Sequence, residues 1–512
     1  MDTVSVGTGP VSFEDVVAVA RGGAGVELSA EALTAIHRAR AVVDDLAASP
    51  VPTYGVSTGF GALATRHIAP ELRAKLQRSL VRSHAAGSGP EVEREVVRAL
   101  MLLRLSTLAT GRTGVRRETA ELLAALLTHG ITPVVHEHGS LGCSGDLAPL
   151  AHCALALMGE GPVRTADGEL TDAATALAAA GLAPVELREK EGLALINGTD
   201  GMLGMLVLAI HDLTDLLRVA DISAAMSVEG QLGTDRVFAP ELQAIRPHPG
   251  QALSAANLTA LLRDSGVVAS HRGPDCNCVQ DAYSLRCSPQ VHGAARDTVA
   301  HAATVAGREL ASAVDNPVVV DTRLESNGNF HGAPVAYVLD FLAIVAADVA
   351  SIAERRTDRF LDRSRSHGLP PFLADDPGVD SGLMIAQYTQ AAVVSELKRL
   401  ASPASVDSIP SSAMQEDHVS MGWSAARKLR RSVDGLSRVL AIELMTAARA
   451  LDLRAPLQPS PATGAVVRLL RDAGVGGPGP DRFLAPEIEA AHRLVTTRAV
   501  TAAVTNTIGE LA

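Results

Sequence analysis

Two long segments, Gly201–Gly230 and Gly332–Arg356, constrain the fold most, because both are apolar around nearly their whole circumference. A helix with no water-facing side is expected in the interior of a bundle or in a membrane. The most apolar run, Gly201–Ile210, ends at a His-Asp pair and is shorter than the roughly 18 residues of a membrane span. We therefore expect these segments to be buried helices of a bundle.

Helical periodicity also dominates elsewhere. In Val92–Gly111 apolar residues recur at helical spacing with charges between them, while Pro317–Val320, followed by the turn-like Glu325–Gly328, predicts one short hairpin. Asp340 and Asp348 fall within the second apolar helix, so we expect them to find partners, either arginines or a neighbouring chain. The pattern predicts a mainly α-helical protein.

The composition excludes several classes of protein. The 512 residues are 47% hydrophobic and 20% charged, which argues against disorder, and 45 Lys and Arg against 57 Asp and Glu give a net charge of -12. Such an acidic chain is a poor candidate for binding nucleic acid or anionic membranes. Five cysteines do not make a disulfide framework, and no basic residue precedes Arg21, as a secretion signal would require. We expect a cytoplasmic protein.

Two motif matches lack the context that their chemistry needs. Gly55–Gly59 fits the G-x-S-x-G of a hydrolase nucleophile, but no apolar strand precedes it. Gly474–Pro480 fits G-x-G-x-x-G, but it also follows no strand and contains prolines, so we expect a connector. Metal-ligand spacing is equally weak, and we expect no metal; the residues considered are Cys276, Cys278, His271, His292 and His136–His138.

The stretch Gly139–His152, GSLGCSGDLAPLAH, places a serine and a cysteine among glycines just ahead of a predicted helix. Asp146 is a suitable N-cap for that helix, and Pro149 falls in its first turn. The dipole and free N–H groups at a helix N-terminus favour negative charge, so an electron acceptor formed at Cys143-Ser144-Gly145 would be strengthened. A capped turn with an incidental serine is the alternative.

This loop resembles the signature of the histidine and phenylalanine ammonia-lyase family, in which Ala-Ser-Gly is the usual central tripeptide. Further matches occur in the same order along nearly the whole chain. They are Tyr54–Gly61, Arg82–Gly87, Asn197–Thr199, Gln280–Arg286, Gly328–His331 and Met414–His418.

The resemblance implies a prosthetic group made from the chain itself. In the family the tripeptide cyclises to 4-methylideneimidazole-5-one, here from Cys143, Ser144 and Gly145, and no external cofactor is needed. A side chain at 145 would obstruct the bend that brings its nitrogen to the carbonyl. Because only the carbonyl of residue 143 enters the ring, cysteine is expected to be tolerated there.

The resemblance also assigns expected roles to site residues. Tyr54 is the expected base, with a lowered pKa, and Tyr283 is a second candidate that positions substrate or shuttles protons. Arg286 is expected to bind the substrate carboxylate, and Asn197 to hydrogen-bond the oxygen of the prosthetic group. Two further residues are expected to line the pocket, namely Gln280 and Phe330.

The polar character of the expected pocket favours histidine as the substrate. His84 and Glu416 match the histidine-specific members, and Met384 is an expected pocket wall. A carboxylate and an imidazole would be left unpaired against a phenyl ring. We expect conversion of L-histidine to trans-urocanate and ammonia; an aromatic ammonia-lyase or an aminomutase is the alternative.

The resemblance finally implies an architecture. It is a large helical bundle of the ammonia-lyase/fumarase-like type, with short strands in a loop-rich region over residues 1–200 and long helices over 201–512. A homotetramer whose active sites combine loops of three chains is expected. The sequence also leaves open a fumarase-type lyase and an inactive helical interaction protein, neither of which would lose water by cyclisation.

Overall fold

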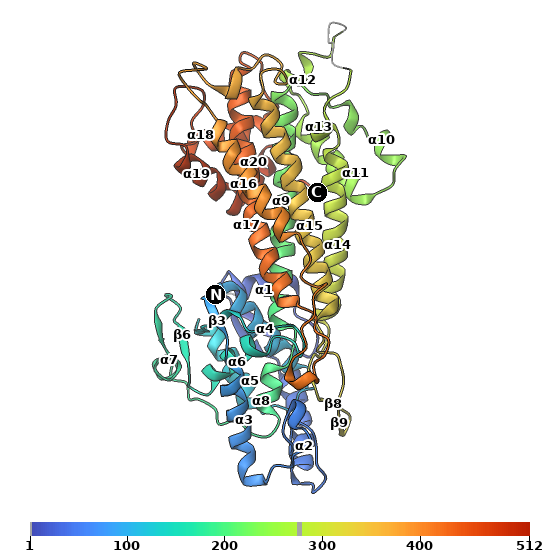
Figure 1. Cartoon of the computed structure of the whole chain (residues 1–512), viewed down its shortest axis with the longest axis vertical. Coiled ribbons are helices and arrows are strands. Elements are labelled where there is room, and N and C mark those ends of the chain that lie inside the picture. The colour runs from blue at the N-terminus through green and yellow to red at the C-terminus, as the bar shows by residue number, and fades with distance from the viewer. Residues whose placement is uncertain (1–2, 274–278) are drawn as a thin grey trace. The chain divides into compact units, whose positions relative to one another are not determined.

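The computed structural model describes residues 3–273 and 279–512, which form two compact units (Figure 1). Unit 1 comprises residues 1–209, 303–340 and 403–427, and unit 2 comprises residues 210–302, 341–402 and 428–512. Four long helices carry residues of both units: α9 (Asp200–Gly230), α14 (Ser288–Leu310), α15 (Ala333–Leu361) and α17 (Gly422–Leu453).

Unit 1 is built from helices packed around α4, with several short strands between them. Helix α4 packs against α1 and α5, and α6 packs against α3 and α8 (Figure 1). The helices are α1 (Phe13–Ala20), α2 (Ala30–Ala48), α3 (Pro70–His84), α4 (Arg94–Ala109), α5 (Arg117–Thr128), α6 (Leu147–Leu157), α7 (Ala173–Ala179) and α8 (Glu191–Ile196), with 3₁₀ turns η1 (Gly61–Leu63) and η4 (Ser412–Met414).

The strands of unit 1 form small separate sheets. One pair is parallel, β1 (Thr3–Val6) with β2 (Gly25–Leu28); the antiparallel sets are β3 (Ser88–Glu91) with β5 (His136–His138), β4 (Thr132–Pro133) with β6 (Pro162–Arg164) and β7 (Leu170–Asp172), and β8 (Val318–Val320) with β9 (Arg323–Glu325). The predicted hairpin is confirmed as β8–β9, with Val318 opposite Glu325. Its turn lies at Asp321, whose φ of 55° is positive, and not at Glu325–Gly328.

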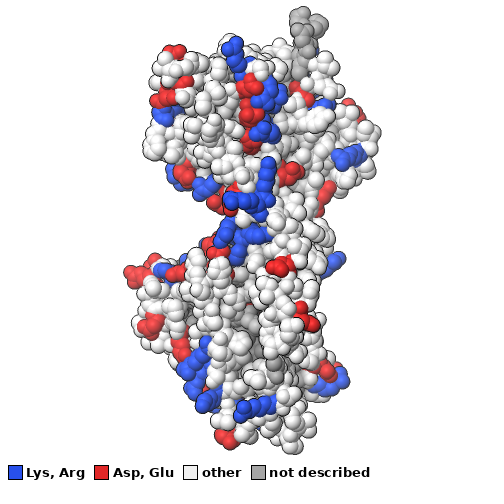
Figure 2. Space-filling view, in the orientation of Figure 1, with Lys and Arg blue, Asp and Glu red and all other residues white. Residues whose placement is uncertain are grey.

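The described residues of unit 2 form helices joined by loops, without a named strand. Helix α18 packs against α20, and α10 packs against α11. Its elements are η2 (Arg236–Phe238), α10 (Pro240–Ala244), α11 (Pro249–Leu261), α12 (Gly266–Ala269), α13 (Tyr283–Arg286), η3 (Pro371–Leu373), α16 (Met384–Leu400), α18 (Pro461–Asp472), α19 (Ala485–Thr496) and α20 (Ala499–Ile508). On the face drawn in Figure 2, acidic and basic side chains are interspersed.

The two long apolar segments differ in burial. Helix α9 is buried nearly all round, as predicted. Helix α15 is not, because Tyr337, Phe341 and Ile344 are exposed at helical spacing. Asp348 is also exposed and needs no buried partner, whereas the buried Asp340 accepts a hydrogen bond from the backbone N–H of Ser405 at 2.8 Å.

Helix α15, unlike the run Gly201–Ile210, contains an apolar stretch as long as a membrane span. Within the described part of the chain, it is the one helix long and apolar enough to cross a membrane by length and composition alone. Of that stretch, 67% is buried inside the protein, and a core helix passes the same test.

The start of α9 is packed too tightly for a side chain at Gly201. A Cβ atom there would lie 2.5 Å from Cζ3 of the buried Trp423 and 2.9 Å from a methyl carbon of Leu100. The Trp423 indole is fixed in turn by donating to the carbonyl of Glu137 at 2.7 Å. The position of α9 in unit 1 therefore depends on a glycine.

We expect Gly201→Ala to lower the free energy of unfolding by about 1–3 kcal/mol, because overpacking forces Trp423 or Leu100 to move. The matched control is Gly307→Ala in α14, where nothing lies within 4 Å of the added Cβ. Alanine is the better helix former, so this control is expected to be neutral or stabilising by about 0.5–1 kcal/mol. Urea unfolding measures both; an equal response of the two variants would contradict the tight packing.

Candidate active site

The loop that carries Ser144 lies between β5 and α6 and folds back on the Asn197-Gly198-Thr199 segment. Gly145 and Gly198 form a parallel β-bridge, and the backbone N–H of Asp146 donates to the Gly198 carbonyl at 2.7 Å. Within the loop, the Ser140 hydroxyl accepts from the N–H of Gly142 at 3.2 Å. The predicted tripeptide and the predicted Asn-Gly-Thr segment are thus brought together by backbone contacts.

Gly145 is required at its position for two reasons. Its φ is +78°, which L-residues with a side chain adopt only at a cost. A Cβ atom would also lie 2.0 Å from the oxygen and 2.3 Å from the carbonyl carbon of Gly198. The sequence predicts glycine here for the bend of the tripeptide, and the structure adds the close approach of the neighbouring backbone.

Asp146 occupies the N-cap position of α6, as predicted, but it caps a different helix. Its side chain makes no capping bond to α6 and instead accepts from the backbone N–H groups of Gly201 and Met202, both at 2.9 Å, in the first turn of α9. The Ser140 hydroxyl donates to its other oxygen at 2.8 Å. Complete burial raises the pKa of this carboxyl to about 7, although the Met202 N–H and the Ser140 hydroxyl act in the opposite direction.

Asn197 is held in a buried polar network. Its amide donates to the carbonyl of Asn316 at 3.0 Å, and its backbone carbonyl accepts from Arg104 at 2.8 Å. The side-chain oxygen of Asn197 is buried without a hydrogen-bond partner among the described residues. Beside it, Lys190 and Asp315 form an ion pair of 2.6 Å that is fully buried, and burial lowers the pKa of the Lys190 ammonium.

Glu416 faces the tripeptide from the loop after η4. One carboxylate oxygen accepts from the Cys143 thiol at 3.1 Å and from the Ser411 hydroxyl at 2.9 Å, and the other accepts from the Ser144 hydroxyl at 3.3 Å. Ser411 is a site residue that sequence reasoning missed. Nothing local in the sequence marks it, because its role arises from the backbone pairing of Ser411 with Glu416.

Tyr54 and His84 are both half-buried, and the Glu416 charge contributes to the pKa of each. Burial raises the pKa of the Tyr54 phenol, the Gly61 N–H opposes this, and Glu416 and Asp315 raise it further. The lowered pKa expected for Tyr54 is therefore not found in this chain by itself, where burial and then the charges of Glu416 and Asp315 all raise it. Burial lowers the pKa of His84, whose Nδ1 is 2.9 Å from the Leu80 carbonyl, so its imidazole is neutral near pH 7.

The remaining predicted residues are distributed over both units. Phe330 is half-buried in unit 1, next to His331, whose ring stacks on that of His418 with centroids 5.6 Å apart. Unit 2 contributes four predicted residues, namely Gln280, Tyr283, Arg286 and Met384. Unit 1 contains the tripeptide, Tyr54, His84, Asn197, Phe330 and Glu416. Of these, Glu416 hydrogen-bonds to the tripeptide, and Gly198, next to Asn197, pairs with Gly145.

In unit 2, helix α13 presents Tyr283 and Arg286 together. The Arg286 guanidinium lies 4.8 Å from the centre of the Tyr283 ring, which is 72% exposed, and the buried Arg286 Nε has no hydrogen-bond partner among the described residues. The turn is anchored from behind by Arg356, which donates to the Ser284 carbonyl at 3.3 Å and is paired with the buried Glu443. A guanidinium held in this way can bind a carboxylate by donating hydrogen bonds to it.

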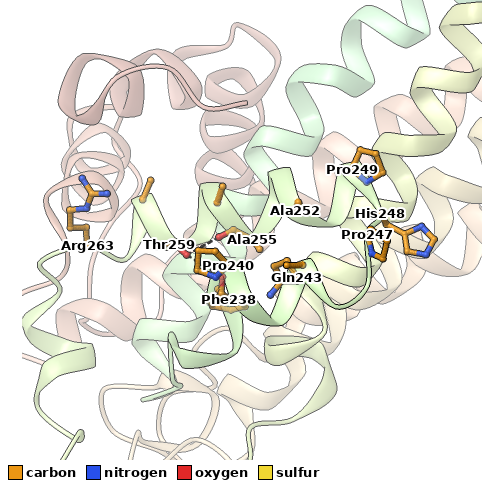
Figure 3. A pocket seen from close by; sticks show the side chains of 13 residues that line it. Phe238, Pro240, Gln243, Pro247, His248, Pro249, Ala252, Ala255, Thr259 and Arg263 are labelled. Carbon is orange, nitrogen blue, oxygen red and sulfur yellow. Dashed lines mark hydrogen bonds between the residues drawn. The ribbon is translucent and has the colours of Figure 1, made fainter.

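Cavities occur in both units, and they differ in whether predicted site residues lie beside them. In unit 2, a cavity of about 590 Å³ is lined mainly by apolar and small residues of η2, α10 and α11, including Phe238 and Ala252, with the polar His248 and Arg263 beside them. None of the predicted site residues lines it (Figure 3). Gln280 lines a different cavity, of about 340 Å³. In unit 1, a cavity of about 710 Å³ is bordered by Asn329 and His331, the neighbours of Phe330.

Of the two motif matches that lack a chemical context, Gly474–Pro480 is a connector, as predicted, and Gly55–Gly59 lies in a turn. Ser57 of the G-x-S-x-G match is buried, and its hydroxyl accepts from the Thr53 N–H at 2.9 Å in a turn after α2. Gly474–Pro480 connects α18 to α19.

The histidines considered as weak metal ligands have other hydrogen-bond partners. His271 hydrogen-bonds backbone carbonyls through both ring nitrogens, and His292 is buried 2.8 Å from Asp221. Cys276 and Cys278 lie outside the described residues. Over residues 3–273 and 279–512, no group of three His, Cys, Asp or Glu side chains is arranged to hold a metal ion.

We expect Gly145→Ala to lower the unfolding midpoint far more than Gly168→Ala. Both glycines have positive φ, +78° and +83°, so each alanine carries a strain of about 1–2 kcal/mol. Only at Gly145 does the new Cβ also meet backbone, whereas nothing lies within 4 Å at Gly168. Thermal unfolding compares the variants, and equal midpoints would contradict the close approach to Gly198.

Comparison with known proteins places this chain in a family. The family described as aromatic amino acid lyase matches residues 11–472. The chain is 69% identical to the histidine ammonia-lyase of Streptomyces coelicolor over 100% of both chains, and 50% identical to that of Sorangium cellulosum over 98% of this chain and 99% of the relative.

Solved structures agree, and they confirm the predicted mainly α-helical fold. The histidine ammonia-lyase of Trypanosoma cruzi superposes with a TM-score of 0.90 at 36% identity, covering 99% of this chain and 96% of the other. The tyrosine aminomutase of Streptomyces globisporus superposes with a TM-score of 0.94 at 39% identity over 100% of both chains. The chain belongs to the aromatic amino acid lyase family.

Proposed function

We propose that this carbon–nitrogen lyase is a histidine ammonia-lyase, which converts L-histidine to trans-urocanate and ammonia. The observation that carries the proposal is the polar cluster of His84 and Glu416 around the tripeptide loop, with Glu416 hydrogen-bonded to Ser144 and Cys143. Full-length relatives at 69% identity are named histidine ammonia-lyase, which supports the same substrate.

The residues present fit a 4-methylideneimidazole-5-one group formed from Cys143, Ser144 and Gly145. Ring closure joins the Gly145 nitrogen to the Cys143 carbonyl carbon and releases two water molecules, one from that carbonyl and one from the Ser144 side chain. The tight backbone cradle at Gly145, which admits no Cβ, supports this assignment. The group supplies an electrophilic carbon for the substrate amine, a chemistry that ordinary side chains lack.

The chain's own residues then share the remaining tasks. Tyr54 removes the β-proton as its phenolate, and Asn197 supplies a polar amide where negative charge develops. His84 and Glu416 bind the imidazole of the substrate, with Met384 and Phe330 as pocket walls and Gln280 as a further contact. Because the Leu80 carbonyl can only accept, Nδ1 of a neutral His84 carries the proton, and Nε2 is left as a hydrogen-bond acceptor.

Arg286 binds the substrate carboxylate, and Tyr283 beside it positions substrate or relays a proton. We propose that these unit 2 residues reach the site from neighbouring copies in a cytoplasmic homotetramer. Four large apolar side chains on α15 and α16 of unit 2 support association, since each is at least 45% exposed: Phe341, Ile344, Ile385 and Tyr388.

The substrate is tested by adding L-histidine, L-tyrosine and L-phenylalanine separately and following product absorbance and free ammonia. We expect L-histidine to be turned over at least about 100-fold more efficiently, because an apolar ring would leave buried polar groups unpaired. Ser144→Ala is the matched control; it is expected to stay folded, to retain the mass of both water molecules and to lose activity. Preferred turnover of tyrosine or phenylalanine, or release of a β-amino acid, would establish the aromatic lyase or aminomutase instead.

The pH dependence of kcat/KM tests Tyr54. Because only the phenolate accepts the β-proton and burial raises the phenol pKa, we expect kcat/KM to rise with pH through the neutral range. Glu416→Gln removes a negative charge that raises this pKa, so the rising limb is expected to move to lower pH even as substrate binding weakens. A limb that stays in place, or moves to higher pH, would exclude Tyr54 as the titrating base.

A further inference from the structure

Three side-chain donors converge on the Glu416 carboxylate, and they are not equivalent. Oε2 accepts from the Cys143 thiol at 3.1 Å and the Ser411 hydroxyl at 2.9 Å, whereas Oε1 accepts only from the Ser144 hydroxyl among these three, at 3.3 Å. The backbone of Glu416 is also fixed, since Ser411 and Glu416 exchange N–H···O bonds of 3.0 and 3.3 Å. One oxygen of the carboxylate is therefore held from two sides.

The Cys143 thiol is suited to a permanent donor role. The residue is only 7% exposed, and burial together with the nearby Glu416 charge raises the thiol pKa to about 12. It therefore stays protonated near neutral pH, and a protonated thiol beside a carboxylate can only donate. The alanine that is usual in the family at this position has no such donor.

Formation of the prosthetic group removes one of the three donors to Glu416 and leaves the other two. The Ser144 hydroxyl leaves as water, so its bond to Oε1 is lost, whereas neither the Cys143 side chain nor Ser411 is consumed. Oε1 of the half-buried Glu416 is then left without that donor, and once a bound substrate covers this oxygen it needs another. An imidazole N–H supplies one, and a phenyl ring does not.

We infer that Cys143 is a positioning residue, whose thiol, with Ser411, holds Oε2 of Glu416 so that Oε1 is free to accept the substrate's side-chain N–H. This inference rests on the proposed function, because it assigns the freed oxygen to the imidazole of histidine. The two groups of Cys143 then have separate roles: its thiol positions Glu416, and its carbonyl carbon becomes part of the ring.

Cys143→Ala and Cys143→Ser test the inference, with Cys153→Ala as the matched control. Cys153 is equally buried, at 5% exposed, but lies within α6 rather than beside Glu416. We expect all three proteins to lose two water molecules, as seen by intact mass. In Cys143→Ala we expect KM for L-histidine to rise about three- to tenfold, with a smaller change in kcat, because one hydrogen bond to the binding group is lost. Cys143→Ser, which keeps a donor, is expected to lie between this variant and the unsubstituted enzyme.

A binding measurement separates positioning from chemistry. In the Ser144→Ala background, which removes the same hydroxyl and forms no ring, calorimetry should show L-histidine binding about three- to tenfold more weakly when Cys143→Ala is added. Cys153→Ala in that background should leave the affinity unchanged. Equal affinity and equal KM with and without the thiol would overturn the positioning role while leaving histidine turnover intact. Absence of histidine turnover by the unsubstituted enzyme would instead refute the proposed function.

Discussion

The carboxylate of Asp146 connects the tripeptide loop to the helical core. It accepts hydrogen bonds from the first turn of α9 and from Ser140, so one buried group fixes both the loop before α6 and the start of a long helix. A buried carboxylate without such donors would be strongly unfavourable. Because α9 is itself buried nearly all round, the loop is hydrogen-bonded to a helix of the core. Gly145 approaches Gly198 closely because no side chain lies between them.

Burial and Glu416 together set the electrostatics of the site. Burial first, and then the Glu416 charge, raise the pKa of the Cys143 thiol and of the Tyr54 phenol, whereas Glu416 acts against the burial that lowers the pKa of His84. The described part of unit 1 thus favours a protonated phenol and a neutral imidazole. A cation brought close to Tyr54 would oppose this effect and lower the pKa of the phenol.

Much of the local organisation could be predicted from the sequence. The burial of α9, the hairpin β8–β9 and the need for glycine at 145 all follow from apolar pattern, β-branched residues and backbone sterics. The exposed stripe on α15 could not, because an apolar side chain carries no mark of whether it faces the core of its own chain or the surface. Ser411 was equally invisible, since its bond to Glu416 needs a turn that no local motif marks.

The sequence by itself determined the reactive loop and the family, since ordered motifs with fixed residue types depend only on the chain. Tertiary structure alone decided which groups face one another. Asp146 precedes α6 yet caps α9, and Cys143 lies 273 positions from the Glu416 carboxylate that it contacts. Hydrogen bonds act over about 3 Å whatever the sequence separation, so these partners became visible only when the packing of the helices brought them together.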